Sequence, residues 1–375
     1  MTYYGVRGDG VGYIYLKGFT DKSTQEVKNA FEDLKKNHQI KSLVLDLRNN
    51  GGGLLESATQ IVGMFVPKGK EVVSTKSKIS QWDRTYRTAN EPLDTVMPMA
   101  ILINGGSASA AEIVSGALQD MDRAVLIGQR SFGKGLVQGT RPVPYNGLLK
   151  VTTAKYYIPS GRLIQAIDYS HRNPDGSVAR TPDSLTTVFK TANGREVRDG
   201  GGITPDVVVT YPEGNRLTYN IVMDWWAFDY ANRFAATTPS IASPEEFEIT
   251  DSIYADFKKF IDPNKLKYDK VCEVRLADLK KVATFEGYMT DSVKAQFEVL
   301  EKLLRHDLDR DLDTHRKDIS EYLAEEIVMR YYYQRGQLIE SLRHDVAVDS
   351  AVNILHDEAK YKKTLKPAKK DVDNK

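Results

Sequence analysis

The segment Ser42–Phe65, SLVLDLRNNGGGLLESATQIVGMF, predicts the fold more clearly than any other part of the chain. It begins with a continuous apolar run, as expected for a strand buried on both faces of a sheet. Three glycines follow, and apolar residues then recur at helical spacing up to Pro67. A second unit passes from the strand Met99–Ile103 through two glycines into the helical stretch AAEIVSGALQDM. The two units predict a layered α/β domain.

The pattern continues on both sides of these units and changes near residue 212. An amphipathic helix is expected around Val27–Leu34, where apolar residues fall at i, i+3, i+4 and i+7. Further strands are expected at Val11–Leu16, Ala124–Ile127, Leu148–Ile158 and Val207–Val209. Beyond residue 212, Gly and Pro become rare and apolar residues recur among charges. We therefore expect an α/β core at 1–212, a mostly helical domain at 213–360 and a disordered tail at 361–375.

The composition excludes several classes of protein. The 375 residues carry 52 basic and 51 acidic side chains and are 41% hydrophobic, which is typical of a globular protein. No basic stripe of the kind that binds nucleic acid occurs, and the single Cys272 can form no internal disulfide. No run of about 18 apolar residues is present, and the first residues lack an export signal. The chain is expected to be either cytosolic or a fragment from which the signal has been removed.

The glycine-rich segment Gly128–Gly135, GQRSFGKG, nearly matches a phosphate-binding P-loop. Gly135 stands where that motif needs Ser or Thr, and the following LVQGTRPVP does not open a helix. Nucleotide binding is therefore disfavoured. Lys134 is then either an ordinary surface lysine or, because Gly and apolar residues flank it, a buried lysine that could act as a base.

A second glycine turn, GGSASAAE, places Ser109 between a strand and a helix, where a nucleophile is favoured. The competing interpretation is structural, because Ser109 and Glu112 also spell a helix capping box. Only His38 and His171 lie in the α/β domain, and both have the flanks of solvated residues. A Ser-His-Asp triad is thus disfavoured, which leaves Lys134 as the candidate base.

The third turn, Asp46–Gly53, reads DLRNNGGG and could point backbone N–H groups at one substrate oxygen. An ordinary tight turn is equally consistent with these glycines. Combined with Ser109 and Lys134, however, the turn completes a set of nucleophile, base and oxyanion donors. Such a set is much rarer than any of its parts.

These residues resemble the carboxy-terminal processing proteases, serine peptidases of the S41 type that have a Ser-Lys dyad and a ClpP/crotonase-like core. LVLDLRNNGGGLLESA, INGGSASAAEIVSGALQD and LIGQRSFGKGLVQ match three ordered blocks of that family. The resemblance covers roughly residues 3–210. It implies an α/β ClpP/crotonase-like core followed by the helical C-terminal domain, and an endopeptidase that acts near apolar C-termini through an acyl-enzyme without a metal or organic cofactor.

Carried over by motif, the resemblance makes Ser109 the nucleophile and Lys134 the general base, with Gln138 orienting the lysine. Because four residues of extended strand span about 13 Å, contact between Lys134 and Gln138 needs a bend. The oxyanion donors would be the N–H groups of Ala110 and of one glycine in Gly51–Gly53, taken as Gly52. Asp120 aligns with an acidic position that we interpret as structural.

The chain also departs from the family pattern, and two other functions stay open. Family members usually carry an export signal and a PDZ domain before the core, and neither is recognised here. The resemblance implies the cell envelope or periplasm, protein substrates and a homo-oligomer formed through the helical domain. One alternative is a catalytically inactive binding or scaffold protein on the same core. The other is a crotonase-like protein that binds acyl-CoA across the glycine turns.

Overall fold

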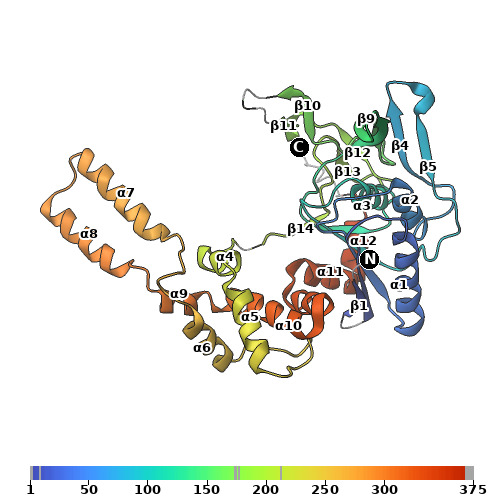
Figure 1. The fold of residues 1–375 in the computed structure, drawn as a ribbon. Helices are drawn as coiled ribbons and strands as arrows, with labels where there is room; N and C mark the ends of the chain where they lie inside the picture. Colours follow the sequence, from blue (N-terminus) through green and yellow to red (C-terminus); the bar gives the residue numbers. More distant parts are fainter. Residues whose placement is uncertain (1–2, 8–9, 173–174, 176–177, 212, 368–375) are drawn as a thin grey trace, which may run out of the picture. The chain divides into compact units, whose positions relative to one another are not determined.

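The structure is a computed structural model that describes residues 3–7, 10–172, 175, 178–211 and 213–367. It divides into two compact units (Figure 1). The first is an α/β unit made of residues 1–211 and 346–375, and the second is a helical unit, residues 212–345. Within the described residues, no helix combines the length and apolarity needed to cross a bilayer.

The α/β unit is built on a mixed sheet whose strand order is β1-β2-β3-β6-β7-β14. Its strands are β1 (Tyr3–Arg7), β2 (Val11–Tyr15), β3 (Ser42–Asp46), β6 (Met99–Ile103), β7 (Val125–Gly128) and β14 (Val207–Val208). All pairs are parallel except β1 with β2. The expected strands are confirmed. Every residue of β3 and β6 is buried, as their continuous apolar runs predict for strands covered on both faces.

Helices cover both faces of this sheet. The helices are α1 (Ser23–Asn37), α2 (Leu55–Gly63), α3 (Ala110–Asp120), α11 (Val346–His356) and α12 (Glu358–Thr364). The core between the sheet and α1–α3 includes Leu43, Leu45 and Ile101. The alternate residues Val44, Ala100 and Leu102 are equally buried, on the opposite face, and α11 contacts β3, β6 and β7.

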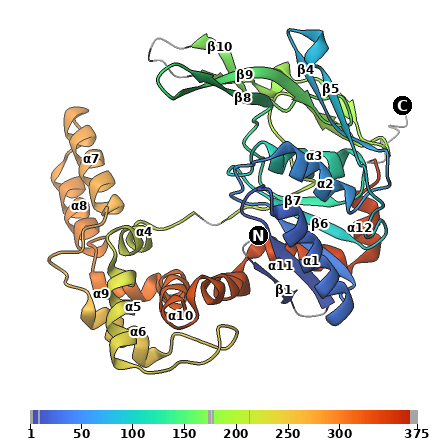
Figure 2. The ribbon, with the colours of Figure 1, turned by 45° about the vertical axis from the view of Figure 1, so that its right-hand side comes forward.

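A second, antiparallel sheet, with strand order β5-β4-β9-β8, lies beyond α2 and α3 (Figure 2). Its strands are β4 (Glu71–Ser77), β5 (Arg84–Arg87), β8 (Leu136–Val143) and β9 (Gly147–Tyr157). Two small ribbons complete the unit: β10 (Ile167–Arg172) with β11 (Val178–Arg180), and β12 (Val188–Lys190) with β13 (Glu196–Arg198). Short 3₁₀ turns occur at η2 (Ser80–Trp82) and η3 (Asp183–Leu185). All eleven residues of α3 are buried, and α3 contacts both sheets.

The second unit is helical, as the change in composition and apolar spacing beyond residue 212 predicts. It contains α4 (Arg216–Met223), α5 (Trp226–Thr237), α6 (Asp251–Phe260), α7 (Val271–Phe285), α8 (Asp291–Leu303), α9 (Leu308–Thr314), α10 (Arg316–Ser341) and the 3₁₀ turn η4 (Leu342–His344). Its core is aromatic-rich, with Tyr230 packed edge-on against Phe257 at a centroid distance of 5.2 Å.

The expected end of the helical domain at residue 360 is corrected by this division. The helical unit ends at Asp345, and the chain from Val346 returns to the α/β unit. Tyr361, expected in the tail, is buried, and its Oη accepts a hydrogen bond from Met99 N at 3.0 Å. Residues 361–367 therefore belong to the α/β unit, whereas residues 368–375 lie outside the described residues.

Candidate active site

Ser109 occupies the turn between β6 and α3, immediately before the first residue of the helix. Its backbone has φ 57° and ψ −115°, a strained conformation that costs about 1–3 kcal/mol. Hydrogen bonds on both sides hold the turn, from Ala108 N to Asn50 O and from Ile113 N to Ser109 O, each at 2.9 Å. The side chain is partly exposed at the positive end of the helix. This is the geometry expected of an exposed nucleophile on a sharp strand-to-helix turn.

The glycine turn Gly51–Gly53 lies directly against Ser109. A Cβ added to Gly52 would come 2.7 Å from the Cβ of Ser109 and 3.0 Å from the backbone nitrogen of Ala110. Gly52 also has φ +99°, which disfavours any side chain. The third turn of the sequence is thus brought against Ser109.

The two predicted oxyanion donors differ in what they bind. The Gly52 N–H donates to Asn50 Oδ1 at 2.9 Å, and Asn50 is itself held because its Nδ2 donates to Leu16 O at 2.6 Å. The N–H of Ala110 stands in the first turn of α3, where no carbonyl of the helix can accept it. In this structure the Gly52 N–H therefore makes a hydrogen bond within its own turn.

The Glu112 carboxylate links the turn that carries Ser109 to the loop that carries Lys134. Its Oε2 accepts the backbone N–H of Ser109 at 2.9 Å and that of Lys134 at 2.8 Å. Its Oε1 accepts the hydroxyl of Ser131 and the N–H of Gly133, the latter at 2.7 Å. Burial raises the pKa of Glu112 against the opposing effect of these four bonds. Ser109 and Lys134, 25 positions apart in the sequence, thus bind one oxygen atom through their backbones.

Tyr156 closes the same region from β9. Its hydroxyl donates to the carbonyl oxygens of Lys134 and Ser109, the latter at 3.3 Å. The ring is 2% exposed, and burial, with a smaller contribution from the Glu112 charge, raises the pKa of Tyr156 well above its ordinary value. The sequence did not single out Tyr156 or the long reach of Glu112. The capping-box spacing was the only signal for Glu112.

The side chains of Lys134 and Gln138 differ in exposure and do not bind each other. Lys134 is partly buried, and Gln138 lies exposed in β8. The pairing of β8 with β9 shifts register between Val137 and Gln138, so the strand is irregular at that point. No hydrogen bond joins these two side chains in the described part of the chain. Another glutamine, Gln165, does bind this loop, because its Oε1 accepts the Gly135 N–H at 2.7 Å.

Asp120 is held in a buried ion pair at the far end of α3. Its Oδ1 lies 2.8 Å from Arg162 Nη2, and both side chains are at most 1% exposed. Its Oδ2 accepts the N–H of Ser160 at 3.0 Å. These bonds fix the segment that follows β9, and so they support the structural interpretation of Asp120.

His38 is half exposed at the end of α1, whereas the side chain of His171 lies outside the described residues.

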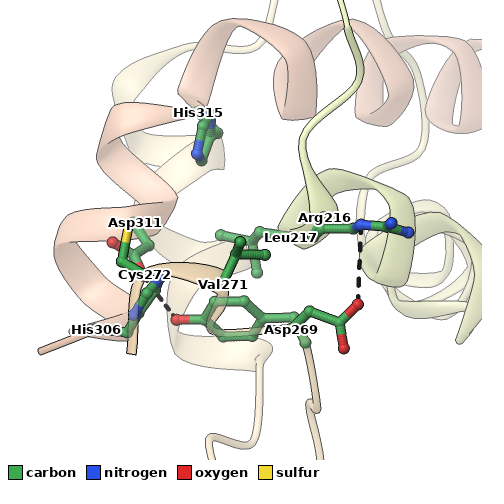
Figure 3. A pocket seen from close by; sticks show the side chains of 9 residues that line it. Arg216, Leu217, Asp269, Val271, Cys272, His306, Asp311 and His315 are labelled. Atoms are coloured by element: carbon green, nitrogen blue, oxygen red, sulfur yellow. Dashed lines mark hydrogen bonds and ion pairs between the residues drawn. The ribbon is translucent and has the colours of Figure 1, made fainter. Parts of the chain in front are cut away.

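The helical unit has a cavity of about 180 Å³ that contains none of the predicted site residues (Figure 3). Tyr268 donates to Asp311 Oδ2 at 2.7 Å beside it, and His306 Nδ1 lies 3.2 Å from Glu273 Oε1. Across the described ranges of both units, no three His, Cys, Asp or Glu side chains are grouped as metal ligands.

Comparison with known proteins identifies both units. Residues 10–175 match the model of peptidase family S41. This match assigns residues 10–175 to peptidase family S41. Residues 217–355 match the model described as "Probable PDZ-protease, C-terminal helical domain". The recognised resemblance is therefore confirmed at the level of the family.

The chain is similar to curated proteases over part of their length. It is 46% identical over 167 residues to the carboxy-terminal-processing protease of Bartonella bacilliformis, which covers 44% of this chain and 38% of that protein. It is 33% identical over 225 residues to a probable CtpA-like serine protease of Staphylococcus haemolyticus, covering 59% and 43%. The matches thus span about two-fifths of these relatives. The solved photosystem II D1 C-terminal processing protease matches with a TM-score of 0.41 and 29% identity, over 54% of this chain and 44% of that one.

Proposed function

We propose that this chain is a serine endopeptidase that cleaves proteins near apolar C-termini through a Ser109–Lys134 dyad. The observation that carries the proposal is the shared Glu112 oxygen, which holds the backbones of Ser109 and Lys134 side by side. The strained, partly exposed Ser109 at the start of α3 supports the same assignment. Curated relatives named as carboxy-terminal-processing or CtpA-like proteases support the substrate class.

In the proposed reaction, neutral Lys134 takes the proton from the Ser109 hydroxyl while the Ser109 oxygen attacks the scissile carbonyl carbon. The carbonyl oxygen becomes an oxyanion, which the Ala110 N–H stabilises. Gly52 N–H would be the second donor once it leaves Asn50 Oδ1. The protonated lysine then gives its proton to the departing amine as the tetrahedral intermediate collapses to the acyl-enzyme. Water, deprotonated by Lys134, hydrolyses the ester and restores Ser109. We assign Gln138 the role of orienting Lys134.

The test is cleavage of an unfolded reporter that ends in apolar residues. We expect Ser109→Ala and Lys134→Ala to abolish cleavage, whereas Lys190→Ala, at an exposed site in β12, leaves it unchanged. A reporter with a charged C-terminus should be cut more slowly. Near-normal turnover by Lys134→Ala would exclude the dyad. Absence of cleavage by the unaltered chain, together with no labelling of Ser109 by a fluorophosphonate, would favour a binding or scaffold role.

We also propose a homo-oligomer formed through the helical unit, and a location in the cell envelope. The hairpin of α7 and α8 leaves large apolar side chains exposed, including Leu279, Phe285 and Leu303. Light scattering should show an oligomer that Phe285→Ser weakens, and a monomer at all concentrations would contradict this part of the proposal. Fractionation of cells that produce the natural protein tests the location.

A further inference from the structure

The β8–β9 hairpin extends beyond the sheet as a two-stranded ribbon (Figure 2). β4 pairs with β9 only over Ala154–Tyr157, whereas β8 pairs with β9 as far as Val143 and Gly147. Three residues, Pro144 to Asn146, close the ribbon between the paired Val143 and Gly147, and Tyr145 and Asn146 have positive φ, 63° and 56°. An isolated two-stranded ribbon is marginally stable in water, because it has little to pack against.

The end of this ribbon is apolar and open to solvent. The exposed fractions are 40% for Val143, 102% for Tyr145, 72% for Leu148 and 53% for Leu149. All four lie within residues 143–149, so they are grouped at one end of the ribbon. Leu148 and Leu149 point to opposite faces, because successive strand residues alternate. We call these four residues the ribbon tip.

A second apolar loop leaves the same end of the sheet. β4 runs antiparallel to β9, with Ser74 opposite Tyr157 and Ser77 opposite Ala154, so β4 runs toward the end at which the ribbon turns. The connection from β4 to β5 exposes Ile79 by 46% and Trp82 by 49%. Trp and Tyr are the side chains enriched at membrane–water interfaces.

Both loops lie among basic side chains with little negative charge. Between Arg123 and Asp168 the sequence contains no Asp or Glu, and residues 76–84 contain a single acid, Asp83. The exposed basic residues of the two segments include Lys76, Lys78, Arg84, Arg141, Lys150 and Lys155. Lys76 and Lys155 stand directly opposite each other in the pairing of β4 with β9. Such like-charged pairs repel each other, and a nearby anionic surface would relieve this repulsion.

From these observations we infer that the ribbon tip and the β4–β5 loop dock on an anionic lipid surface. The tip projects its side chains outward, whereas recognition of a peptide usually requires a groove or pocket that surrounds it. A bilayer accepts a projecting apolar tip, and its anionic headgroups complement the surrounding lysines and arginines. Because β8 begins two residues after Lys134 and ends at Val143, the proposed dyad lies at the base of the ribbon and the docking tip at its other end.

The test is co-sedimentation of the full chain with vesicles of phosphatidylglycerol and phosphatidylcholine, with pure phosphatidylcholine vesicles as reference. We expect binding only to the anionic vesicles and release by added salt. The triple variant Tyr145→Ser, Leu148→Ser, Leu149→Ser should weaken binding at least about tenfold, as should Arg141→Glu with Lys150→Glu. Matched controls should bind normally: Val96→Ser, Leu185→Ser, Val208→Ser at exposed apolar sites, and Lys36→Glu with Lys41→Glu at exposed lysines.

An environment-sensitive dye at residue 145 shows whether the ribbon tip binds a lipid surface or a polypeptide substrate. It is attached through Tyr145→Cys in a chain that also carries Cys272→Ser, because Cys272 is exposed. The expected result is a shift toward apolar emission with anionic vesicles. Failure to bind anionic vesicles, or binding that the ribbon-tip variant leaves unchanged, would overturn the inference. A dye that responds to an unfolded apolar polypeptide and not to vesicles would assign the surface to substrate instead.

Discussion

At the scale of single residues, the Glu112 carboxylate determines how the site is assembled. Each of its oxygens accepts two hydrogen bonds, and three of the four donors are backbone N–H groups. In Glu112→Gln, one oxygen becomes an NH₂ group that cannot accept hydrogen bonds, although the side chain keeps its size. At least one backbone N–H then loses its partner. We expect a loss of about 3 kcal/mol in the free energy of unfolding and more than about 100-fold in kcat.

Urea unfolding and reporter cleavage measure the two effects of Glu112→Gln. Glu56→Gln is the matched control, because Glu56 lies exposed in the first turn of α2. If Glu112→Gln kept full activity and stability, the shared carboxylate would not position Ser109 and Lys134.

The glycines of the third turn provide a second test at residue scale. Gly52→Ala would place a Cβ within 3.0 Å of three atoms of residues 108–110 at a positive φ, whereas a Cβ on Gly51 meets no atom within 4 Å. We expect Gly52→Ala to cost about 2–4 kcal/mol and to abolish cleavage, and Gly51→Ala to cost less than about 1 kcal/mol. Thermal unfolding and cleavage of both variants check this contrast. Equal behaviour of the two would show that close packing of Gly52 on Ser109 is unimportant.

How far the site can be predicted from the sequence depends on the range of each contact. Ser109, Lys134 and the glycine turn follow from local motifs, and the structure brings Ser109 and the turn together. The reach of Glu112 to Gly133 and Lys134 depends on how α3 packs against a distant loop, and no local pattern encodes that. The Asn50 bond to Gly52 was missed for a different reason. The side-chain oxygen of an asparagine can accept from any of several nearby backbone N–H groups, and the sequence does not specify which.

At the scale of elements, helix α10 carries an unfavourable group of acids. Burial, followed by the charges of Glu340 and Glu326, raises the pKa of Glu325 from 4.5 to about 7. The folded chain therefore binds this proton more tightly than the unfolded chain. The resulting stabilisation is complete below pH 4.5 and is lost as the pH rises through 7. Glu325→Gln should be about 2 kcal/mol more stable than the unaltered chain at pH 8 and nearly equal to it at pH 5.

Chemical unfolding at the two pH values measures this difference for Glu325→Gln. Glu298→Gln, at an exposed position of α8, should show no such dependence. A Glu325→Gln variant that gains nothing at pH 8 would mean that the carboxyl group is already stabilised as an anion.

The elements themselves were predictable wherever burial dominates the sequence. β3, β6 and α3 follow directly from apolar runs and helical spacing, and the structure places them where expected. β4 and β5 were not expected, because β5 is short and mostly exposed and β4 pairs with β9, which lies far away in the sequence. Strand pairing of that kind is a tertiary effect that composition does not report.

At the scale of the whole molecule, the chain leaves the α/β unit at residue 211 and returns to it at Val346. The helical spacing of α11 predicts a helix but does not say which core it covers, and so the boundary at residue 360 was wrong. Removal of residues 346–375 would expose Val44, Ala100 and Leu102 on one face of the main sheet. We expect that truncated chain to lose cooperative unfolding and to aggregate.

Tyr361→Ala is the milder form of the same test. It removes a buried ring and the acceptor of the Met99 N–H, and it should cost about 3–5 kcal/mol while leaving the unfolding cooperative. Calorimetry of both variants measures the effect. Normal melting of the truncated chain would contradict the assignment of α11 and α12 to the α/β core.

The central claim is that Ser109 is a nucleophile activated by Lys134. Mass spectrometric mapping of the covalent adduct formed with a fluorophosphonate tests it most directly. We predict an adduct on Ser109 in the unaltered chain, no adduct on that peptide in Ser109→Ala, and formation at least about 100-fold slower in Lys134→Ala. An adduct on another residue, or an unchanged rate in Lys134→Ala, would contradict the account.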